Sequence, residues 1–276
     1  MLQDPFALKN SKFLTIPLWE KMNCQLQVGF TVRNEGYSSI PFESFNLGLH
    51  VGDRDTDVGK NRELLVEVLH STLEDMVVGE QIHQGEIAKV SNVHRGAGAK
   101  SLDSAIKGVD GLYTSEKDVL LTSLYADCVP LYFFAPTSGL IGLAHAGWKG
   151  TVSPIGPNMI DIWNNEKNVA VEDIHVAIGP SISGSCYEVD SNVITHVDTL
   201  CEARGLPLPY QTVSNGKYLL DLKELNKQLL LNKGVLEKNI LVSQYCTVKN
   251  NNLFFSHRKE KGKTGRMMSF IRVRAK

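Results

Sequence analysis

One cysteine and two histidines have the chemistry needed for a catalytic centre. Cys128 and His145 lie near the two ends of SLYADCVPLYFFAPTSGLIGLAHAGWKG (123–150), and His83 lies in a separate polar segment, QIHQG (81–85). A thiolate and two imidazoles are zinc ligands, and three protein ligands with one open position are typical of catalytic zinc. Zinc in such a site activates a water molecule or polarises a substrate oxygen. The residue types therefore predict a metal site made of His83, Cys128 and His145.

The same side chains support other chemistry, and the residues alone leave these alternatives open. Cys128 is also a candidate thiolate nucleophile that His145 would activate, which requires the same atoms as a metal site. The nearest carboxylate, Asp127, is either a catalytic acid or a hydrogen-bonded structural one. In a third alternative, the chain is a catalytically idle scaffold that keeps zinc for structure, although structural zinc usually has four protein ligands.

A second group of candidates is basic or polar and would bind substrate. Histidine, arginine and lysine crowd the segment SHRKEKGKTGR (256–266), a density that suits either a bound phosphate or a solvated basic loop. Two further candidates come from a Gly-rich loop and from the start of a predicted helix. The five candidate substrate-binding residues are Asn46, Arg62, His257, Arg258 and Arg266.

A β-hairpin is expected to bring Cys128 and His145 together. The apolar runs 131–134 and 140–144 flank the turn sequence PTSG, which is a hairpin pattern. With the turn centred between its second and third residues, Cys128 faces Gly147 and projects from the same face as His145. Diagonal neighbours on paired strands lie roughly 7 Å apart, within reach of a shared ion. A shift of one residue would reverse the face.

The remaining pattern mixes strands and helices irregularly, which favours an α+β fold with mixed sheets. Apolar spacing predicts helices over 57–69, from 148 to about 163, over 193–203 and over 222–232. Strands are predicted over 13–16, 25–32, 119–125, 174–178, 240–243, 253–255 and 267–273, with two short strands within 76–90. A turn is predicted at Asp110-Gly111, and the Pro-, Ser- and Gly-marked segment 206–216 predicts an irregular connection.

Composition limits the class of protein. The 276 residues carry a formal net charge of −1, so no global basicity indicates nucleic acid or an acidic membrane as a partner. Five widely spaced cysteines without a CxxC pair indicate free thiols in a reducing compartment. The chain has no 18-residue apolar run and no signal-peptide pattern at its start. We therefore expect a cytoplasmic protein, while its oligomeric state is not indicated.

Several enzyme classes are disfavoured by missing motifs. The chain has eight histidines and no His-x-His pair, too few closely spaced ligands for the several copper ions of a multicopper oxidase. The H-x-E and P-C-x-x-C signature of nucleotide deaminases is absent. So are the GxxxxGK[ST] phosphate loop and the GxGxxG fingerprint.

The motifs together resemble the YfiH/YlmD family, also called the laccase-domain or multicopper polyphenol oxidase-like family. The pairing of ADC (126–128) with HAGW (145–148) is specific, and the resemblance covers nearly the whole chain in order. The matching segments are FNLGLHVGD (45–53) followed by Asn61-Arg62, QIHQG (81–85), DGLYT (110–114), ADCVPL (126–131), HAGWKG (145–150), AIGPSISGSCYEVD (177–190), YLLDLKELNKQLLLNKG (218–234) and CTVKNNNLFFSHRKEKGKTGR (246–266).

The resemblance implies a fold, a cofactor and an activity. It implies a single α+β domain over 1–276, with mixed sheets flanked by helices, as in cysteine hydrolases of the cytotoxic necrotizing factor type. It implies zinc, with copper as an alternative, on His83, Cys128 and His145. The implied activity is purine nucleoside phosphorylase on adenosine, inosine, guanosine and methylthioadenosine, with adenosine deaminase activity in the same site. Some bacterial members instead resemble amidases that edit cell-wall precursors, and the laccase name conflicts with the histidine count.

Three positions depart from the family pattern. Lys149 stands where arginine is common, Gln84 separates His83 from the following glycine, and His257 replaces a frequent tyrosine. None of these changes removes an expected metal ligand. The last two would alter the fit of the substrate, and His257 adds a candidate proton donor.

Overall fold

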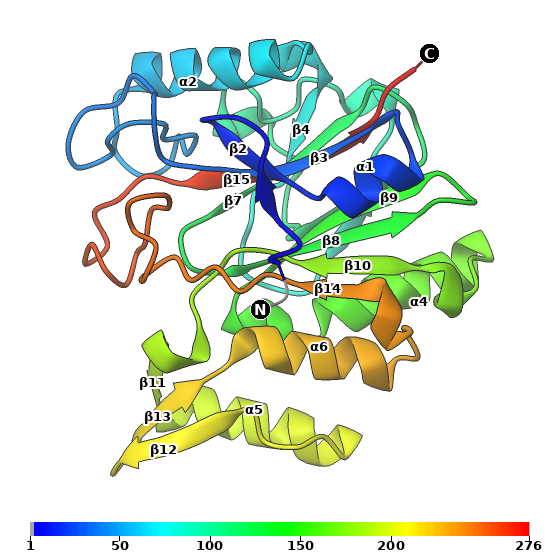
Figure 1. Cartoon of the computed structure of the whole chain (residues 1–276), viewed down its shortest axis with the longest axis vertical. Coiled ribbons are helices and arrows are strands. Elements are labelled where there is room, and N and C mark those ends of the chain that lie inside the picture. Colours follow the sequence, from blue (N-terminus) through cyan, green and yellow to red (C-terminus); the bar gives the residue numbers. More distant parts are fainter. Residues whose placement is uncertain (1–2, 276) are drawn as a thin grey trace.

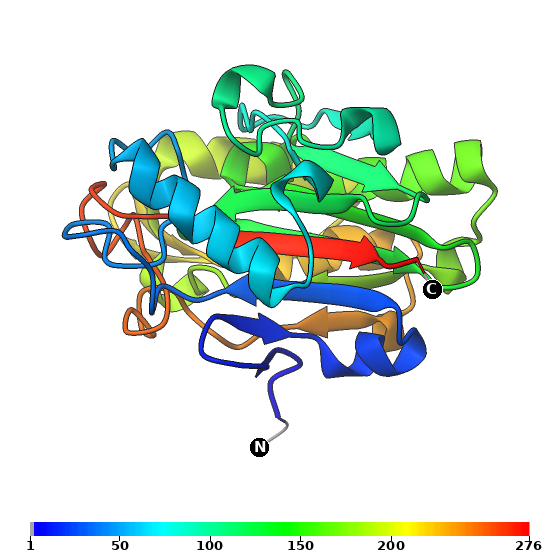
Figure 2. The same ribbon diagram turned by 90° about the horizontal axis from the view of Figure 1, so that it is seen from above.

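Two large β-sheets stack face to face in the computed structural model, which describes residues 3–275 (Figures 1 and 2). The first sheet has the strand order β1 (Ala7–Leu8), β2 (Phe13–Thr15), β3 (Leu26–Thr31), β15 (Met267–Val273), β7 (Leu120–Tyr125) and β4 (Met76–Val78). The second has the order β14 (Ile240–Val242), β10 (His175–Ile178), β8 (Val129–Ala135), β9 (Leu140–Ala146), β6 (Gly111–Thr114) and β5 (Ile87–Lys89). Both sheets combine parallel and antiparallel pairs, so the expected α+β fold with mixed sheets is confirmed.

Helices cover the outer faces of the sheets, and a small third sheet lies at one end of the molecule (Figure 1). The third sheet has the order β11 (Glu188–Asp190), β13 (Lys217–Leu220) and β12 (Tyr210–Ser214). The α-helices of the described residues are α1 (Pro17–Met22), α2 (Asp55–Val68), α3 (Trp148–Val152), α4 (Ile155–Lys167), α5 (Ser191–Arg204) and α6 (Leu222–Asn232). Short 3-10 turns are Leu73–Asp75, Asn92–His94, Leu102–Ser104, Val171–Asp173, Gly184–Cys186 and Glu237–Asn239. Within the described range, no helix is both long and apolar enough to cross a membrane.

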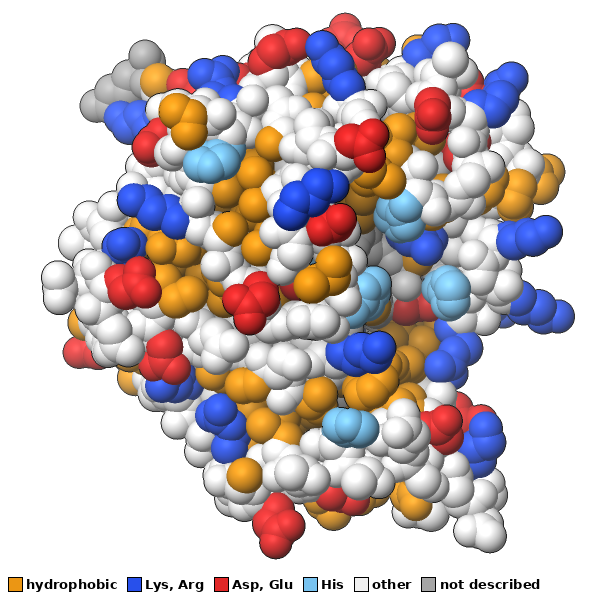
Figure 3. Space-filling view, turned by 180° about the vertical axis from the view of Figure 1, so that it is seen from behind, with side chains coloured by type: hydrophobic (Ala, Val, Ile, Leu, Met, Phe, Trp, Pro, Cys, Tyr) orange, Lys and Arg blue, Asp and Glu red, His pale blue; other side chains and the backbone are white. Residues whose placement is uncertain are grey.

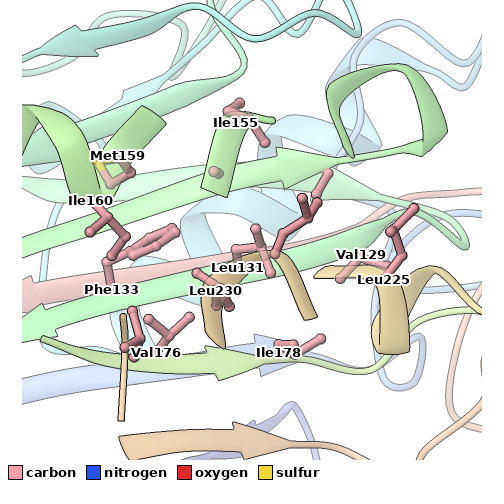
Figure 4. Close-up of a cluster of buried hydrophobic side chains, with 14 of the residues drawn as sticks. Val129, Leu131, Phe133, Ile155, Met159, Ile160, Val176, Ile178, Leu225 and Leu230 are labelled. Atoms are coloured by element: carbon pink, nitrogen blue, oxygen red, sulfur yellow. The ribbon is translucent and has the colours of Figure 1, made fainter. Parts of the chain in front are cut away.

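Strand β8 lies at the centre of the core because both of its faces are covered. Val129, Leu131 and Phe133 pack against α4 and α6 (Figure 4). Tyr132 and Phe134 point the other way, into the apolar layer between the two sheets. Burial on both faces explains why this strand reads as a continuous apolar run rather than as an alternating one.

The sequence patterns identified most elements, but the helix predicted from 148 to about 163 is divided into α3 and α4, and three other segments were misassigned. The expected connection over 206–216 contains strand β12, whose residues are largely exposed at the edge of the small sheet. The expected strand over 253–255 is irregular, because Phe254 and Phe255 are anchored individually in the core. Strand β6 begins directly at Gly111, where the sequence indicated only a turn. Strands β12 and β6 form because they pair with β13 and with β5 and β9, respectively, whereas 253–255 is fixed by side-chain packing.

Candidate metal centre

Two connections that pass from one sheet to the other meet at the same end of the stacked sheets. Residues 126–128 join β7 of the first sheet to β8 of the second, and residues 79–86 join β4 to β5 in the same way. Cys128 lies in the first connection and His83 in the second, while His145 is the second-last residue of β9. The candidate site is therefore built where the chain crosses between layers.

The hairpin register places Cys128 and His145 as expected. Pro130 pairs with His145 and Val129 with Ala146, so position 128 faces Gly147. The candidate ligand atoms of His83, Cys128 and His145 all lie within 4.8 Å of one another. The two imidazole rings are perpendicular, with centroids 4.7 Å apart. His145 is buried, Cys128 is half-buried and His83 is exposed, so the group opens outward on one side.

Asp110 orients both histidines of the group from behind. Its Oδ1 lies 3.0 Å from Nδ1 of His145 and accepts a hydrogen bond from the backbone N–H of His83, while Oδ2 accepts one from the N–H of Gln84. The side chain of Asp110 is fully buried. A hydrogen bond from Nδ1 to the carboxylate leaves Nε2 of His145 free as a ligand, an arrangement common around metal-bound histidines.

The electrostatics of the group favour a thiolate. Burial opposes ionisation of Cys128, but the charges and hydrogen bonds of His145 and His83 lower its pKa to about 6. Burial also opposes the charge on His145, and the neighbouring Cys128 and Asp110 raise its pKa to about 9. A thiolate is the form of cysteine that binds metals and acts as a nucleophile.

Gly147 leaves room for the three candidate ligands. A Cβ atom at this position would lie 3.0 Å from Sγ of Cys128 and 3.7 Å from carbon atoms of both His145 and His83. Its backbone φ of −63° is ordinary, so the need for glycine is steric rather than conformational. The glycine of HAGW thus keeps the space between the ligands open.

The connection that carries His83 is held in an uncommon backbone conformation. Gln81 and His83 have φ angles of 57° and 61°, which are rare for residues with a side chain. The side-chain amide of Gln81 donates from Nε2 to the backbone carbonyl of Leu124 at 2.9 Å, and its Oε1 accepts from the backbone N–H of Leu124 at 2.7 Å. These bonds attach the connection to the end of β7, and surrounding structure of this kind is what sustains such a conformation.

These observations fit one metal ion. A thiolate with two imidazoles is a donor set that suits zinc or copper, and carboxylate–histidine contacts such as that of Asp110 accompany metal-bound histidines. Within residues 3–275, this is the one group of three or more closely spaced candidate ligands. Because it supplies three ligands, the fourth position of a tetrahedral ion would face the adjoining cavity.

The cavity in front of the ligands has a volume of about 470 Å³, within the range of small-molecule sites. Figure 3 shows this region as a hollow bordered by histidines and by Lys and Arg side chains. The lining residues are His50, Gly79, Glu80, Gln81, His83, Leu102, Leu124, Ala126, Asp127, Cys128, His145, Ile182, Tyr187, His257, Arg258 and Arg266.

Three of the five expected substrate-binding residues line this cavity. They are His257, Arg258 and Arg266. Neither arginine forms an ion pair with a carboxylate within the described residues. Arg258 instead packs over the ring of Tyr187, 5.2 Å from its centroid, and donates to the carbonyl of Glu188.

The other two expected residues, Asn46 and Arg62, lie outside the cavity lining and are fully buried. Nε of Arg62 donates to the carbonyl of Leu47, and Nη1 donates to those of Gly98 and Ala99. The guanidinium therefore joins two loops beside the cavity, and burial lowers its pKa to about 10.

Sequence reasoning assigned no role to several residues of the site. Asp110 and Tyr187 lie in the motifs DGLYT and AIGPSISGSCYEVD, and His50 lies in FNLGLHVGD. Residue type alone could have marked His50 as a candidate, but its loop gave no periodicity from which its direction could be inferred. The role of Asp110 depends on contacts with residues 27 and 35 positions away, which no local pattern reveals.

Comparison with known proteins gives consistent matches along the chain. A family model described as multi-copper polyphenol oxidoreductase laccase matches residues 27–274. Purine nucleoside phosphorylase YlmD of Bacillus subtilis is 44% identical over 274 residues, covering 97% of this chain and 96% of that protein. Purine nucleoside phosphorylase YlmD of Geobacillus stearothermophilus is 49% identical over 243 residues, covering 88% of each.

Solved structures show the same fold. The crystal structure of YlmD from Geobacillus stearothermophilus has a TM-score of 0.94 and 44% identity, and the match covers 99% of this chain and 100% of that one. The crystal structure of the hypothetical protein YfiH of Bacillus licheniformis has a TM-score of 0.92 and 42% identity, with coverage of 99% and 100%.

Proposed function

The chain belongs to the family described as multi-copper polyphenol oxidoreductase laccase, and we propose that it is a metal-dependent purine nucleoside phosphorylase. One observation carries the proposal beyond the names of its relatives. The cavity that exposes the three candidate ligands is also lined by Arg258 and Arg266, whose guanidinium groups form no ion pair with a carboxylate in the described chain. A metal centre and an anion-binding surface thus share one cavity.

The proposal assigns zinc to His83, Cys128 and His145, with copper as the alternative. Bound there, zinc would supply a Lewis acid at the wall of the cavity. Asp110 would keep Nε2 of His145 directed at the ion through its bond to Nδ1. A single group of ligands in the described chain supports one ion and gives no support to the several copper ions that a laccase needs.

Phosphorolysis forms a bond between a phosphate oxygen and C1′ of the ribose, and it breaks the glycosidic C–N bond. The electron pair of that bond leaves with the base, which takes up a proton. Guanidinium groups in the cavity would hold the phosphate by charge-assisted hydrogen bonds and position it against the sugar. We assign proton donation to His257, which lines the same cavity.

The proposed substrates are adenosine, inosine, guanosine and methylthioadenosine. We include adenosine deamination, in which water adds to the amino-bearing carbon of the base and the amino group leaves as ammonia. Nucleic acid and membranes are not among the proposed partners. All five cysteines are free in the described chain, which supports the proposed cytoplasmic location.

The test separates the products formed from adenosine with and without phosphate, after metal analysis of the purified protein. Adenine and ribose 1-phosphate that appear only with phosphate would support phosphorolysis, and inosine in either condition would support deamination. Cys128→Ala should lose both the metal and the activity, whereas Cys24→Ala, at an exposed cysteine, should keep both. Metal-loaded protein that forms neither product would refute the proposal.

A second candidate function is favoured by the pKa values of Cys128 and His145. The pKa of the thiol falls to about 6 and that of the imidazole rises to about 9, so the metal-free pair is a thiolate beside an imidazolium at neutral pH. Such a pair suits a thiol amidase that edits cell-wall precursors. An amidase of this kind would survive chelation and be inactivated by iodoacetamide, whereas the metal-dependent enzyme would lose activity on chelation.

A further inference from the structure

Arg266 is a partly buried cation whose position is fixed from several sides. Its backbone N–H donates to Oδ1 of Asn46 at 2.8 Å, and its carbonyl accepts from the N–H of Leu47. Its Nη1 donates to the carbonyls of Thr264 and Gly265. The side chain therefore enters the cavity in a set direction, and it pairs with no carboxylate of the described chain. A partly buried guanidinium without a carboxylate partner can bind an anionic ligand by charge-assisted hydrogen bonds.

Gly48 brings His50 beside this arginine. A Cβ atom at Gly48 would lie 2.7 Å from Cγ of Arg266 and 3.4 Å from Cε1 of His50. Only a glycine lets both side chains pack against this stretch of backbone. Asn46 holds the arrangement, because its Oδ1 accepts from the N–H groups of both Gly48 and Arg266, while its Nδ2 donates to Asp53.

His50 complements the arginine as a hydrogen-bond donor. The ring lines the cavity and is open to solvent at its mouth. Enclosure by the cavity wall and the positive charge of Arg266 lower its pKa to about 4, so the ring is neutral at neutral pH. A neutral imidazole offers one N–H, and a guanidinium offers a planar fork of N–H groups that matches the oxygens of a phosphate.

Arg258 is used differently, although it lines the same cavity. Its guanidinium lies over the ring of Tyr187 and donates to the carbonyl of Glu188. These contacts attach it to the wall formed by β11 and the turn before it. Arg258 therefore adds positive charge at the cavity wall, whereas Arg266 and His50 lie side by side over Gly48.

We propose that His50 and Arg266, side by side over Gly48, form an oxyanion subsite for a phosphate group. The inference rests on the proposed function, since phosphorolysis requires a phosphate beside the sugar. Two sources share this chemistry, namely free inorganic phosphate and the 5′-phosphate of a nucleoside monophosphate. The subsite also gives Asn46 a role, because that side chain positions the subsite without touching the ligand.

The first experiment measures binding of inorganic phosphate to the metal-loaded protein by calorimetry, in parallel with steady-state kinetics on adenosine. Arg266→Lys should raise the Kd and the KM for phosphate roughly 10- to 100-fold, because it removes a bidentate charge-assisted contact, while the KM for adenosine changes little. His50→Ala should raise both phosphate constants roughly 10-fold, and His50→Gln, which keeps an N–H donor, should recover part of the loss.

Further variants separate the subsite from a general loss of structure. Gly48→Ala should weaken phosphate binding without removing either ligand-binding side chain, and Lys263→Ala, exposed in the same basic loop, should match the unmodified protein. Thermal unfolding verifies that each variant folds. Unchanged phosphate binding in Arg266→Lys and His50→Ala, or a loss found only in Arg258→Ala, would overturn the proposal.

Two further measurements distinguish the source of the phosphate and the fate of the proposed function. Competition between phosphate and adenosine 5′-monophosphate that depends on His50 and Arg266 would identify a nucleotide phosphate as a ligand. Phosphate binding that depends on both residues, without phosphorolysis, would keep the subsite and refute the phosphorylase. Absence of binding by either compound would overturn the subsite.

Discussion

Replacing Asp110 by asparagine tests whether the site is organised for a metal. The carboxylate accepts from Nδ1 of His145 and from the backbone N–H groups of His83 and Gln84. Asparagine has nearly the same shape, but it carries no charge and offers one oxygen and one NH₂ group. At least one of the three donors then faces another donor inside the protein.

The size of the effect follows from these contacts. Loss of an orienting carboxylate behind a metal-bound histidine typically lowers metal affinity by about 10- to 100-fold, or about 1.4–2.7 kcal/mol. A buried donor without an acceptor costs about 1–3 kcal/mol of folding stability in addition. Asp110→Asn should therefore weaken metal binding and also lower the melting temperature of the metal-free protein.

Zinc affinity is measured by competition with a chromogenic chelator, and stability by thermal unfolding of the metal-free protein. Asp173→Asn, a substitution at an exposed carboxylate of the turn before β10, serves as the control and should match the unmodified protein in both assays. If Asp110→Asn bound zinc as tightly as the control, the carboxylate would not orient a metal ligand and the reasoning would fail.

Three other substitutions have definite expected outcomes. Gly147→Ala should weaken zinc binding in the chelator assay, because it places a Cβ 3.0 Å from Sγ of Cys128. The control Gly59→Ala, whose Cβ would meet nothing within 4 Å, should bind zinc as tightly as the unmodified protein. Equal zinc affinities of the two variants would contradict the steric argument. Burial raises the pKa of Asp75, but hydrogen bonds from Ser71 and Thr72 and the charge of Arg95 lower it overall. The ionised Asp75 carboxylate therefore stabilises the folded protein above its unfolded pKa near 4, and this stabilisation is lost as pH falls through the lower folded pKa. Asp75→Asn should lower the free energy of unfolding by about 1.5–3 kcal/mol at pH 7. Urea unfolding should also show that the stability of the variant depends less on pH below pH 4, and an unchanged pH profile would refute this. Arg62→Lys should lower the melting temperature, because lysine cannot replace all three bonds to carbonyls, and an unchanged value would show that these bonds contribute nothing.

The hairpin shows what the sequence could predict about the site. Its turn and two apolar runs gave the register, and the structure pairs Pro130 with His145 as that register requires. A period-two pattern fixes which side chains share a face, so the proximity of Cys128 and His145 followed from local information. The position of His83 had no such support, since it depends on a crossing between two sheets.

The basic candidates show the limit of that approach. Arg62 and Arg266 are both arginines in motif segments, but one joins buried loops while the other lines the cavity. The difference arises from the direction in which each side chain leaves its backbone, and Gly48 and Asn46 determine that direction for Arg266. Composition and spacing carry no information about contacts that join residues some 220 positions apart.

Asp127 illustrates how the crossing between sheets couples the candidate ligands to the rest of the cavity. Both of its carboxylate oxygens are occupied, one by the hydroxyl of Thr247 and the other by the backbone N–H of Arg258. Its carbonyl accepts from the N–H of Ile182. These contacts favour the structural role of Asp127 over the catalytic one, although the side chain also lines the cavity. Because Asp127 directly precedes Cys128, the same residue connects a candidate ligand to two cavity-lining residues, Ile182 and Arg258.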